Sequence, residues 1–214
     1  MMSTLDKRAK LDAVLALAPV IPVITIDDAA HAVPLARALV SGGLRVIEIT
    51  LRTQAGLDAA RAIIGEVPDA VVGIGTVLTP ADYERAARLG AAFAISPGLS
   101  IELLDAANAG ELPFAPGVQT ASDLIACVTR GYELVKFFPA VPAGGLAALD
   151  ALAGPFPSVR FCPTGGINAG NAAQWLAHKK VVAIGGSWVA PAADIRAGAW
   201  AAIELRAREA TKLR

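Results

Sequence analysis

Short apolar runs alternate with alanine-rich segments along almost the whole chain, and this alternation restricts the fold more than any other feature. Eight runs begin 20 to 26 residues apart, and they cover residues 20–26, 45–51, 71–77, 93–96, 113–116, 134–138, 159–163 and 181–187. The segments between them have helical spacing of apolar residues, as at 28–41, 57–66, 80–89 and 101–109. Several of the helical segments close on a glycine where a helix C-cap would fall, namely Gly42, Gly90, Gly110 and Gly131. Strands that alternate with helices at this period form βα units with parallel strands.

Eight βα units in one chain predict an α/β fold of the (β/α)8 TIM barrel type. The alternative is an open doubly wound sheet, but no Gly-x-Gly-x-x-Gly follows the first run, where such a sheet carries it. Residues 5–17 have a helical pattern that ends before Pro19, so we expect an extra N-terminal helix within 1–18 that caps the barrel bottom. No linker or composition break is seen, which predicts a single barrel domain over 1–214.

Composition argues against several classes of function. The 19 basic and 19 acidic residues give a net charge of zero, so neither nucleic acid nor an anionic membrane is expected as a partner. No apolar run approaches the roughly 18 residues of a membrane span, and the polar N-terminus is unlike a signal peptide; we therefore expect a cytoplasmic protein. Cys127 and Cys162 are expected to be buried free thiols. His31 and His178 stand alone, so no metal site is expected.

Lys136 lies in the middle of the apolar run from Leu134 to Phe138. Lysine is depleted from strands and is rarely buried without a partner. One interpretation is an edge strand with the amine in water, or a side chain that extends to the surface. The other is a lysine kept inside for its chemistry. Because strand side chains alternate, Leu134, Lys136 and Phe138 share one face in either case.

Glu48 occupies a similar position in the second run. Alternation along residues 45–52 places Glu48 and Arg52 on one face, and the opposite face suits packing under the helices. Active sites of (β/α)8 barrels lie at the C-terminal ends of the strands, so we expect Glu48 inside the barrel and Arg52 near its rim. A purely structural ion pair between Lys136 and Glu48 is the alternative.

Glycine, threonine and proline gather at the ends of other runs. The third run ends in Gly75-Thr76, and the fourth is followed by Pro97. Paired glycines follow the seventh and eighth runs, in Thr164-Gly165-Gly166 and Gly185-Gly186-Ser187. Barrels of this type often bind phosphate at these two ends, through exposed backbone N–H groups and a helix N-terminus. Each pair alone is consistent with an ordinary turn, but both together favour a site for phosphate or a similar anion.

These residue types together predict a reaction. Burial favours the neutral amine of a lysine, which attacks carbonyl carbons, and the resulting Schiff base is an electron sink. A nearby carboxylate can carry the protons that imine formation and C–C cleavage require, and an arginine can bind a substrate carboxylate. Lys136, Glu48, Arg52 and an anion site therefore predict an aldolase for a phosphorylated keto acid. It requires no cofactor beyond the covalent Schiff base on Lys136.

At these residues the chain closely resembles the 2-keto-3-deoxy-6-phosphogluconate (KDPG) aldolases, class I enzymes of the KDPG/KHG type that act in the Entner–Doudoroff pathway. KHG is 2-keto-4-hydroxyglutarate. The resemblance runs from Pro19 over nearly the whole remaining chain. It rests on six motifs: Glu-Ile-Thr-Leu-Arg-Thr at 48–53, Gly-Thr-Val-Leu at 75–78, Ala-Ile-Ser-Pro-Gly at 94–98, Val-Lys-Phe-Phe-Pro-Ala at 135–140, Phe-Cys-Pro-Thr-Gly-Gly-Ile at 161–167 and Ile-Gly-Gly-Ser-Trp at 184–188.

The resemblance implies that Lys136 is the Schiff-base lysine and that Glu48 is the general acid/base. The implied substrate-binding residues are Arg52 and Thr76 for the pyruvyl carboxylate, Pro97 and Phe138 as lining of that pocket, and Thr164 for the aldehyde portion. The implied phosphate-binding residues are Gly165, Gly166, Gly186 and Ser187. The family cleaves KDPG reversibly to pyruvate and D-glyceraldehyde 3-phosphate and forms homotrimers, so we expect a small keto-acid phosphate as substrate and a homotrimer.

Three alternatives stay open at this level. Members of the family also cleave 2-keto-4-hydroxyglutarate to pyruvate and glyoxylate, or the galactonate-series phospho-keto acid, and one sequence does not settle the preference. A non-catalytic barrel that binds a sugar phosphate would be expected to lack Lys136 or Glu48, and both are present. Arg160 shares a face with Cys162 and Thr164, which predicts that it points into the barrel bottom toward a partner that the sequence does not identify.

Overall fold

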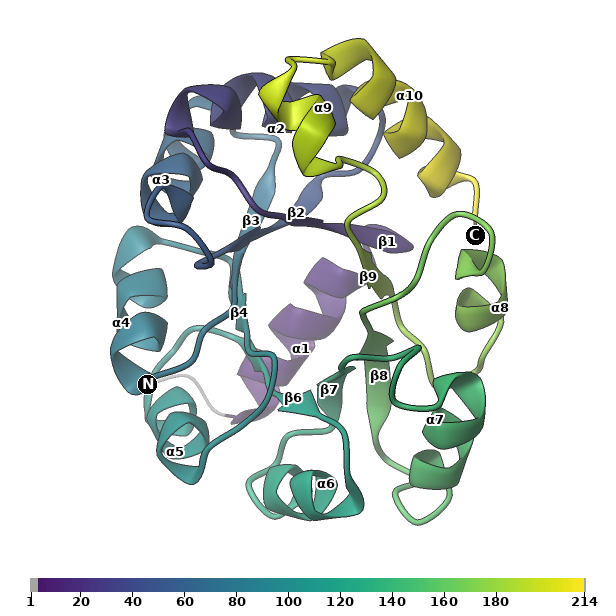
Figure 1. The fold of residues 1–214 in the computed structure, drawn as a ribbon. Coiled ribbons are helices and arrows are strands. Elements are labelled where there is room, and N and C mark those ends of the chain that lie inside the picture. Colours follow the sequence, from purple (N-terminus) through teal and green to yellow (C-terminus); the bar gives the residue numbers. More distant parts are fainter. Residues whose placement is uncertain (1–3, 214) are drawn as a thin grey trace.

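The computed structural model describes residues 4–213, and it is an α/β fold in which parallel strands surround a central interior and helices cover their outside (Figure 1). The strands are β1 (Val20–Ile24), β2 (Val46–Thr50), β3 (Val71–Gly75), β4 (Phe93–Ile95), β5 (Phe114–Ala115), β6 (Gly117–Val118), β7 (Leu134–Phe137), β8 (Arg160–Pro163) and β9 (Ile184–Gly186). The helices are α1 (Thr4–Leu15), η1 (Ala29–His31, a 3-10 turn), α2 (Ala32–Ser41), α3 (Gly56–Glu66), α4 (Pro80–Leu89), α5 (Ile101–Ala109), α6 (Ala121–Val128), α7 (Gly145–Ala153), α8 (Ala172–Leu176), α9 (Ala192–Arg196) and α10 (Trp200–Thr211).

The strands form two parallel sheets that together make a ring. One sheet has the order β5-β4-β3-β2-β1-β9, and the other has the order β6-β7-β8. At one seam, isolated bridges pair Phe161 with Val181 and Thr164 with Gly185, which joins β8 to the β9 side. At the other seam, β5 and β6 are consecutive in the chain. The βα order expected from the alternating pattern is therefore present around the whole ring.

One predicted strand differs from the structure. The pattern at 113–116 predicts one continuous strand, but the structure has two short strands, β5 and β6, on either side of Pro116. Proline has no N–H to donate to a ladder, so it interrupts the strand at this point. Ser96, which follows β4, links β4 to β6 across this break, because its Oγ accepts a hydrogen bond from Gly117 N–H at 3.0 Å.

The helix ends agree with most of the sequence signals. Thr79 and Asp82 form a capping box at the start of α4, and Gly90 ends that helix in the left-handed conformation with φ +82°. Gly42 and Gly110 are the C-caps of α2 and α5, as expected. The prediction for Gly131 is wrong, because α6 ends at Val128 and Gly131 lies in the following turn.

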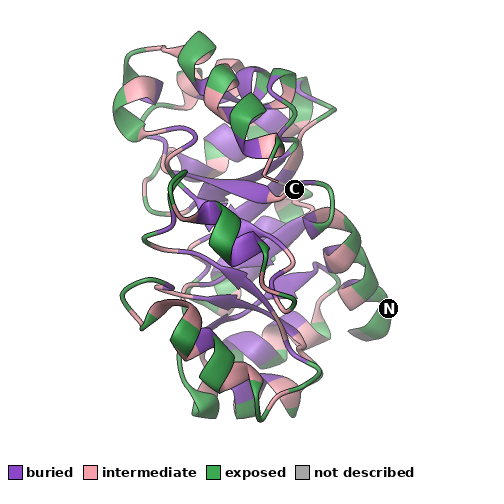
Figure 2. Cartoon of the chain, turned by 90° about the vertical axis from the view of Figure 1, so that its right-hand side faces the viewer, coloured by how far each residue is buried: buried purple, intermediate pink, exposed green. Residues whose placement is uncertain are grey.

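Buried residues concentrate in the strands and on the helix faces that cover them, whereas the outer helix faces are exposed (Figure 2). Ile47 and Ile49 of β2 are fully buried on the face opposite Glu48, as the alternation predicted. Cys127 and Cys162 are both buried and free of disulfide bonds. None of the helices between Thr4 and Leu213 has the length and apolar character needed to cross a bilayer.

Helix α1 lies across the centre of the ring in Figure 1 and contacts β5. Arg160, at the start of β8, donates to both carboxylate oxygens of Asp12 in α1 at 2.7 Å, and this identifies the partner that the sequence left open. Arg8 of the same helix pairs with Glu133 before β7. The expected N-terminal helix is thus present from Thr4, and residues 1–3 of the expected segment lie outside the described residues.

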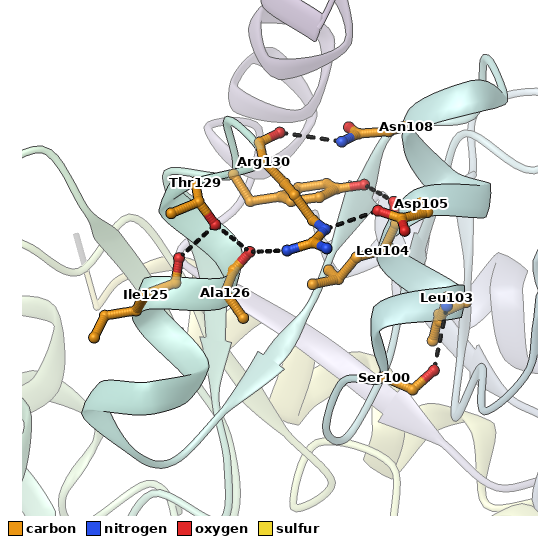
Figure 3. A network of polar contacts seen from close by, with 10 residues as sticks. Ser100, Leu103, Leu104, Asp105, Asn108, Ile125, Ala126, Thr129 and Arg130 are labelled. Carbon is orange, nitrogen blue, oxygen red and sulfur yellow. Dashed lines mark hydrogen bonds and ion pairs between the residues drawn. The ribbon is translucent and has the colours of Figure 1, made fainter.

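Polar contacts also join neighbouring outer helices. Figure 3 shows such a network between α5 and the end of α6, centred on Arg130. The Arg130 guanidinium donates to Asp105 at 2.7 Å, and the side chain of Asn108 donates to the Arg130 carbonyl at 3.2 Å. These contacts tie neighbouring helices of the outer layer together.

Candidate active site

Lys136 and Glu48 face each other inside the ring. Lys136 comes from β7 and Glu48 from β2, and their side chains are each only 2 % exposed. The Nζ of Lys136 donates to Glu48 Oε1 at 3.2 Å. The interpretation of Lys136 as a solvated edge residue is therefore wrong, because strand alternation turns its side chain inward while Val135 and Phe137 pack outward, fully buried.

The other surroundings of the Lys136 amine are weakly polar. The ring of Phe138 lies 5.3 Å from Nζ, and Cys162 is the strand neighbour of Lys136 in the β7–β8 register. Burial raises the pKa of the Cys162 thiol to about 12, so the thiol stays protonated and adds no charge. Within residues 4–213 Nζ has a single hydrogen-bond partner, Glu48. Because an ammonium group has three N–H donors, the amine keeps bonding capacity for a ligand.

Gly75 at the end of β3 makes room for the Glu48 carboxylate. A Cβ at this position would lie 2.1 Å from Glu48 Oε1, which is far inside any contact distance. The next residue, Thr76, has φ +59°, a conformation that is unfavourable for a β-branched residue. Backbone strain of this kind tends to persist where function requires it. The residues at the end of β3 therefore accommodate the Glu48 carboxylate as well as the geometry of the strand.

A cavity of about 220 Å³ opens at the C-terminal ends of the strands, next to the Lys136 pair. Phe138 connects the two, because its ring contacts Nζ and also lines the cavity. The lining residues are Val23, Arg52, Phe138, Thr164, Gly165, Gly166, Ile167, Gly185, Gly186 and Ser187. A second cavity of about 570 Å³ shares five lining residues with the first: Val23, Arg52, Gly166, Ile167 and Ser187.

The Thr164 hydroxyl in this cavity has no hydrogen-bond partner among the described residues, although it is buried and lies near the Cys162 thiol. Gly185 leaves space for it, because a Cβ there would lie 2.2 Å from Thr164 Oγ1. A buried polar atom without a partner is costly, so a ligand atom that bonds it would be favoured. The hydroxyl therefore marks a place where a polar ligand group fits.

Arg52 lies in the turn after β2, exposed, and lines both cavities. Among the arginines between Thr4 and Leu213, each of the others pairs with a carboxylate, whereas Arg52 has no ion pair and no hydrogen bond. A guanidinium in this situation is available for an anionic ligand. Its position near the rim agrees with the expectation, although the strand ends at Thr50, before it reaches Arg52.

The structure brings most of the predicted site residues together. Seven of them line the 220 Å³ cavity: Arg52, Phe138, Thr164, Gly165, Gly166, Gly186 and Ser187. Thr76 and Pro97 follow β3 and β4 at the same end of the ring but do not line it. Val23, Ile167 and Gly185 were missed. Gly185 belongs to the quoted Gly-Gly pair, but nothing in the sequence distinguished Val23 from other strand residues.

One feature of the expected anion site differs from the structure. No long helix begins directly after Ser187, since α9 starts only at Ala192, so the available donors are the backbone N–H groups of the loops.

Within residues 4–213, His, Cys, Asp and Glu side chains nowhere form a group of three that could hold a metal ion.

Comparisons with known proteins agree with this geometry. The family model described as KDPG and KHG aldolase matches residues 11–205. The KHG/KDPG aldolase of Escherichia coli is 50% identical over 205 residues, which are 96% of each chain.

Two solved structures are similar along nearly their whole length. The Legionella pneumophila KDPG aldolase, described with pyruvate captured as a covalent carbinolamine intermediate, has a TM-score of 0.91 and 44% identity, and the match covers 94% of this chain and 97% of that one. The Zymomonas mobilis 2-keto-3-deoxy-6-phosphogluconate aldolase with 3-phosphoglycerate has a TM-score of 0.90 and 45% identity, over 95% and 96% of the two chains. The chain therefore belongs to the KDPG and KHG aldolase family.

Proposed function

We propose that the protein is a class I aldolase of the Entner–Doudoroff pathway that cleaves KDPG reversibly to pyruvate and D-glyceraldehyde 3-phosphate. The observation that carries this proposal is the buried pair in which Lys136 Nζ lies 3.2 Å from Glu48 Oε1, beside a cavity with an unpaired arginine. An amine next to a carboxylate in a buried position can attack a ketone and pass protons. Family membership adds support from the names of the relatives.

In this mechanism the Lys136 amine adds to the C2 ketone, and loss of water through a carbinolamine gives the imine. Glu48 carries the protons that these steps require. The C3–C4 bond then breaks as the C4 hydroxyl gives its proton to Glu48. The electron pair of that bond moves toward the protonated imine nitrogen, which leaves an enamine of pyruvate on Lys136. Protonation of the enamine and hydrolysis release pyruvate and restore the amine.

The remaining residues bind the substrate. We assign Arg52 and Thr76 to the pyruvyl carboxylate and Thr164 to the aldehyde portion, with Pro97 and Phe138 beside them. The free guanidinium of Arg52 and the unpartnered hydroxyl of Thr164 support these assignments. The phosphate is assigned to the backbone of Gly165, Gly166, Gly186 and Ser187. No metal or other cofactor takes part in any of these steps.

The finer features of the fold belong to the same proposal. We infer a single (β/α)8 TIM barrel over 1–214 with an extra N-terminal helix, in which β5 and β6 are two halves of one barrel strand. The bridges between β8 and the β9 side support closure of the barrel. We also propose that the protein is a homotrimer in the cytoplasm.

Reduction with borohydride in the presence of pyruvate tests the central step. It should attach pyruvate irreversibly to Lys136, and peptide mass spectrometry should locate the adduct there. An adduct on another lysine, or no adduct at all, contradicts the mechanism. Activity should also survive EDTA, since strong inhibition would indicate a metal-dependent aldolase.

Substrate preference requires a separate comparison. We expect cleavage of KDPG, and weaker cleavage of 2-keto-4-hydroxyglutarate to pyruvate and glyoxylate. Faster cleavage of the galactonate-series phospho-keto acid than of KDPG would replace the proposed substrate while it keeps the mechanism. Phosphate-ester binding without any cleavage would instead favour a non-catalytic binding barrel.

A further inference from the structure

The loop after β8 has its hydrogen-bond acceptors engaged and some of its donors free. The carbonyl oxygens of residues 164–166 accept hydrogen bonds from three groups outside that segment. These are the N–H groups of Ala140 and Val141, at 2.8 and 3.0 Å, and the side-chain amide of Asn171, at 3.2 Å. The N–H of Gly166, by contrast, donates to no other described residue, and the same is true of Ser187. Such a loop presents donors, without competing acceptors, to the 220 Å³ cavity that it lines.

Asn171 is the one side chain among these three donors, and both ends of its amide are engaged. Its Nδ2 donates to Gly166 O, while its Oδ1 accepts from Asn168 N–H at 2.8 Å. These two backbone groups flank the buried residue Ile167 and are the pair that a neighbouring strand would bond. Because one partner is a donor and the other an acceptor, the orientation of the amide is determined.

Gly166 also packs closely against Val141. Its φ is +77°, and a Cβ on it would lie 2.6 Å from Val141 Cβ. Only glycine therefore fits at this position, and its carbonyl cannot turn into the cavity without the loss of the Asn171 bond. The peptide unit that carries this carbonyl also carries the Ile167 N–H, which donates to no described residue, so the Asn171 bond fixes the direction of that N–H beside the cavity.

We propose that Asn171 is a positioning residue for the anionic end of the substrate. It does not touch the ligand; it bonds the Gly166 carbonyl and Asn168 N–H, so that the backbone donors of residues 165–167 stay directed into the cavity. This proposal rests on the proposed function, in which the phosphate of KDPG occupies that cavity. It assigns Asn171 no part in the chemistry at Lys136.

The proposal predicts a split between phosphorylated and phosphate-free ligands. In Asn171→Ala, KM for KDPG and the inhibition constant of inorganic phosphate should each rise about tenfold, the ratio expected for the loss of a positioned hydrogen bond. Turnover at saturation, and the pyruvate concentration that half-saturates borohydride trapping on Lys136, should change by less than about twofold. Gln174→Ala is the matched control, because Gln174 is an exposed amide on α8 with no side-chain hydrogen bond among the described residues.

Asn171→Asp separates the two bonds of the amide. A carboxylate can still accept from Asn168 N–H but cannot donate to Gly166 O, and it adds a negative charge near the anion site. KM for KDPG should therefore rise more than in Asn171→Ala, while pyruvate trapping stays unchanged. Equal affinity of wild type and both variants for KDPG and for phosphate would overturn the proposal.

The outcomes also distinguish this proposal from the proposed function. A wild-type protein that neither cleaves KDPG nor traps pyruvate on Lys136 contradicts the proposed function; phosphate binding, followed by phosphorus NMR in wild type and variants, then decides the role of Asn171 alone. Variants that weaken pyruvate trapping and KDPG cleavage equally, with a lower melting temperature, would show a general structural role and refute the positioning role.

Discussion

Two buried lysines lie at opposite ends of the ring, and their surroundings differ. Lys7 of α1 is 7 % exposed, and its Nζ donates to three backbone carbonyls, those of Ala107 at 3.1 Å, Asn108 at 2.8 Å and Gly110 at 2.9 Å. These carbonyls end α5, where a cation is favoured. Lys136 is only 2 % exposed, but among the described residues its Nζ has one partner, Glu48. Three donors of Lys7 are thus used for structure, whereas Lys136 keeps capacity for a ligand.

The same contrast holds for the two ends of the ring as a whole. At the end of the ring that carries α1, Arg160 pairs with Asp12 and Arg8 with Glu133, so each of these arginines has a carboxylate partner. At the other end, which carries the 220 Å³ cavity, Arg52 and the Thr164 hydroxyl have no hydrogen-bond partner among the described residues. A buried lysine is therefore not by itself a sign of catalysis. The number of its bonds that the protein satisfies distinguishes the structural residue from the chemical one.

Replacement of each lysine by methionine tests this contrast most strongly. Lys136→Met removes the nucleophile and should lower kcat/KM for KDPG by at least about 10³-fold, with no pyruvate trapped by borohydride. Lys7→Met should leave kcat/KM within about twofold. It should instead lower the free energy of unfolding by about 1–3 kcal/mol, because the α5 carbonyls lose their donor. Denaturant unfolding and steady-state kinetics on both variants measure the two effects, and a similar profile for the two would break the comparison.

Glu48→Gln tests whether the partner of Lys136 moves protons or only holds the amine. The substitution keeps the size of the side chain, so pyruvate should still bind and be trapped. Turnover should fall by roughly 10²-fold or more, since an amide cannot act as general acid or base. If pyruvate affinity collapsed together with turnover, Glu48 would be a structural partner, much as the α5 carbonyls are for Lys7.

Gly75→Ala tests the space that positions Glu48. The added methyl would lie 2.1 Å from Glu48 Oε1, so the carboxylate must move away from Lys136. Turnover should fall by roughly 10- to 10²-fold, because a displacement of about 1 Å can cost that much. Gly65→Ala in α3 is the control, since its Cβ would meet nothing within 4 Å. That variant should keep full activity and gain up to about 1 kcal/mol from helix propensity.

Asp82→Asn tests what holds the loop after β3 in place, and its expected effect is the smallest of the four. Asp82 accepts from the N–H groups of Leu78 and Thr79, both at 3.0 Å, just after Thr76. Although burial acts to raise it, the pKa of Asp82 is lowered from 3.8, because Arg85 and these N–H groups bond the carboxylate.

The folded state therefore binds the Asp82 proton less readily than the unfolded chain, and the resulting stability is present above pH 3.8 and lost as pH falls below it. The variant should lose about 1 kcal/mol at pH 7, a typical value for a helix cap, and the difference from wild type should shrink toward pH 3. Melting temperatures at the two pH values measure this. A constant difference would mean that the carboxylate charge is not what anchors the loop.

Much of the fold could be read from local patterns, and the exceptions have physical causes. Alternation placed Lys136 and Glu48 inward correctly because side-chain direction along a strand depends only on the residue's own position. The break at Pro116 was missed because the run on either side is apolar, although proline lacks a ladder donor. The partner of Arg160 was not predictable, since Asp12 lies 148 residues away in the chain.

By itself the sequence determined the order of strands and helices, the inward face of each strand, and the residue types available for an aldol cleavage. The elements and faces follow from periods of two and 3.6 residues, which are local, and the residue types are read directly from the sequence. Only the tertiary structure decided that Glu48 and Lys136, 88 residues apart, meet at 3.2 Å, and that Arg52 alone among the described arginines lacks a carboxylate. Ring closure sets those distances, because it brings distant strands together across one interior where every side chain competes for the same space.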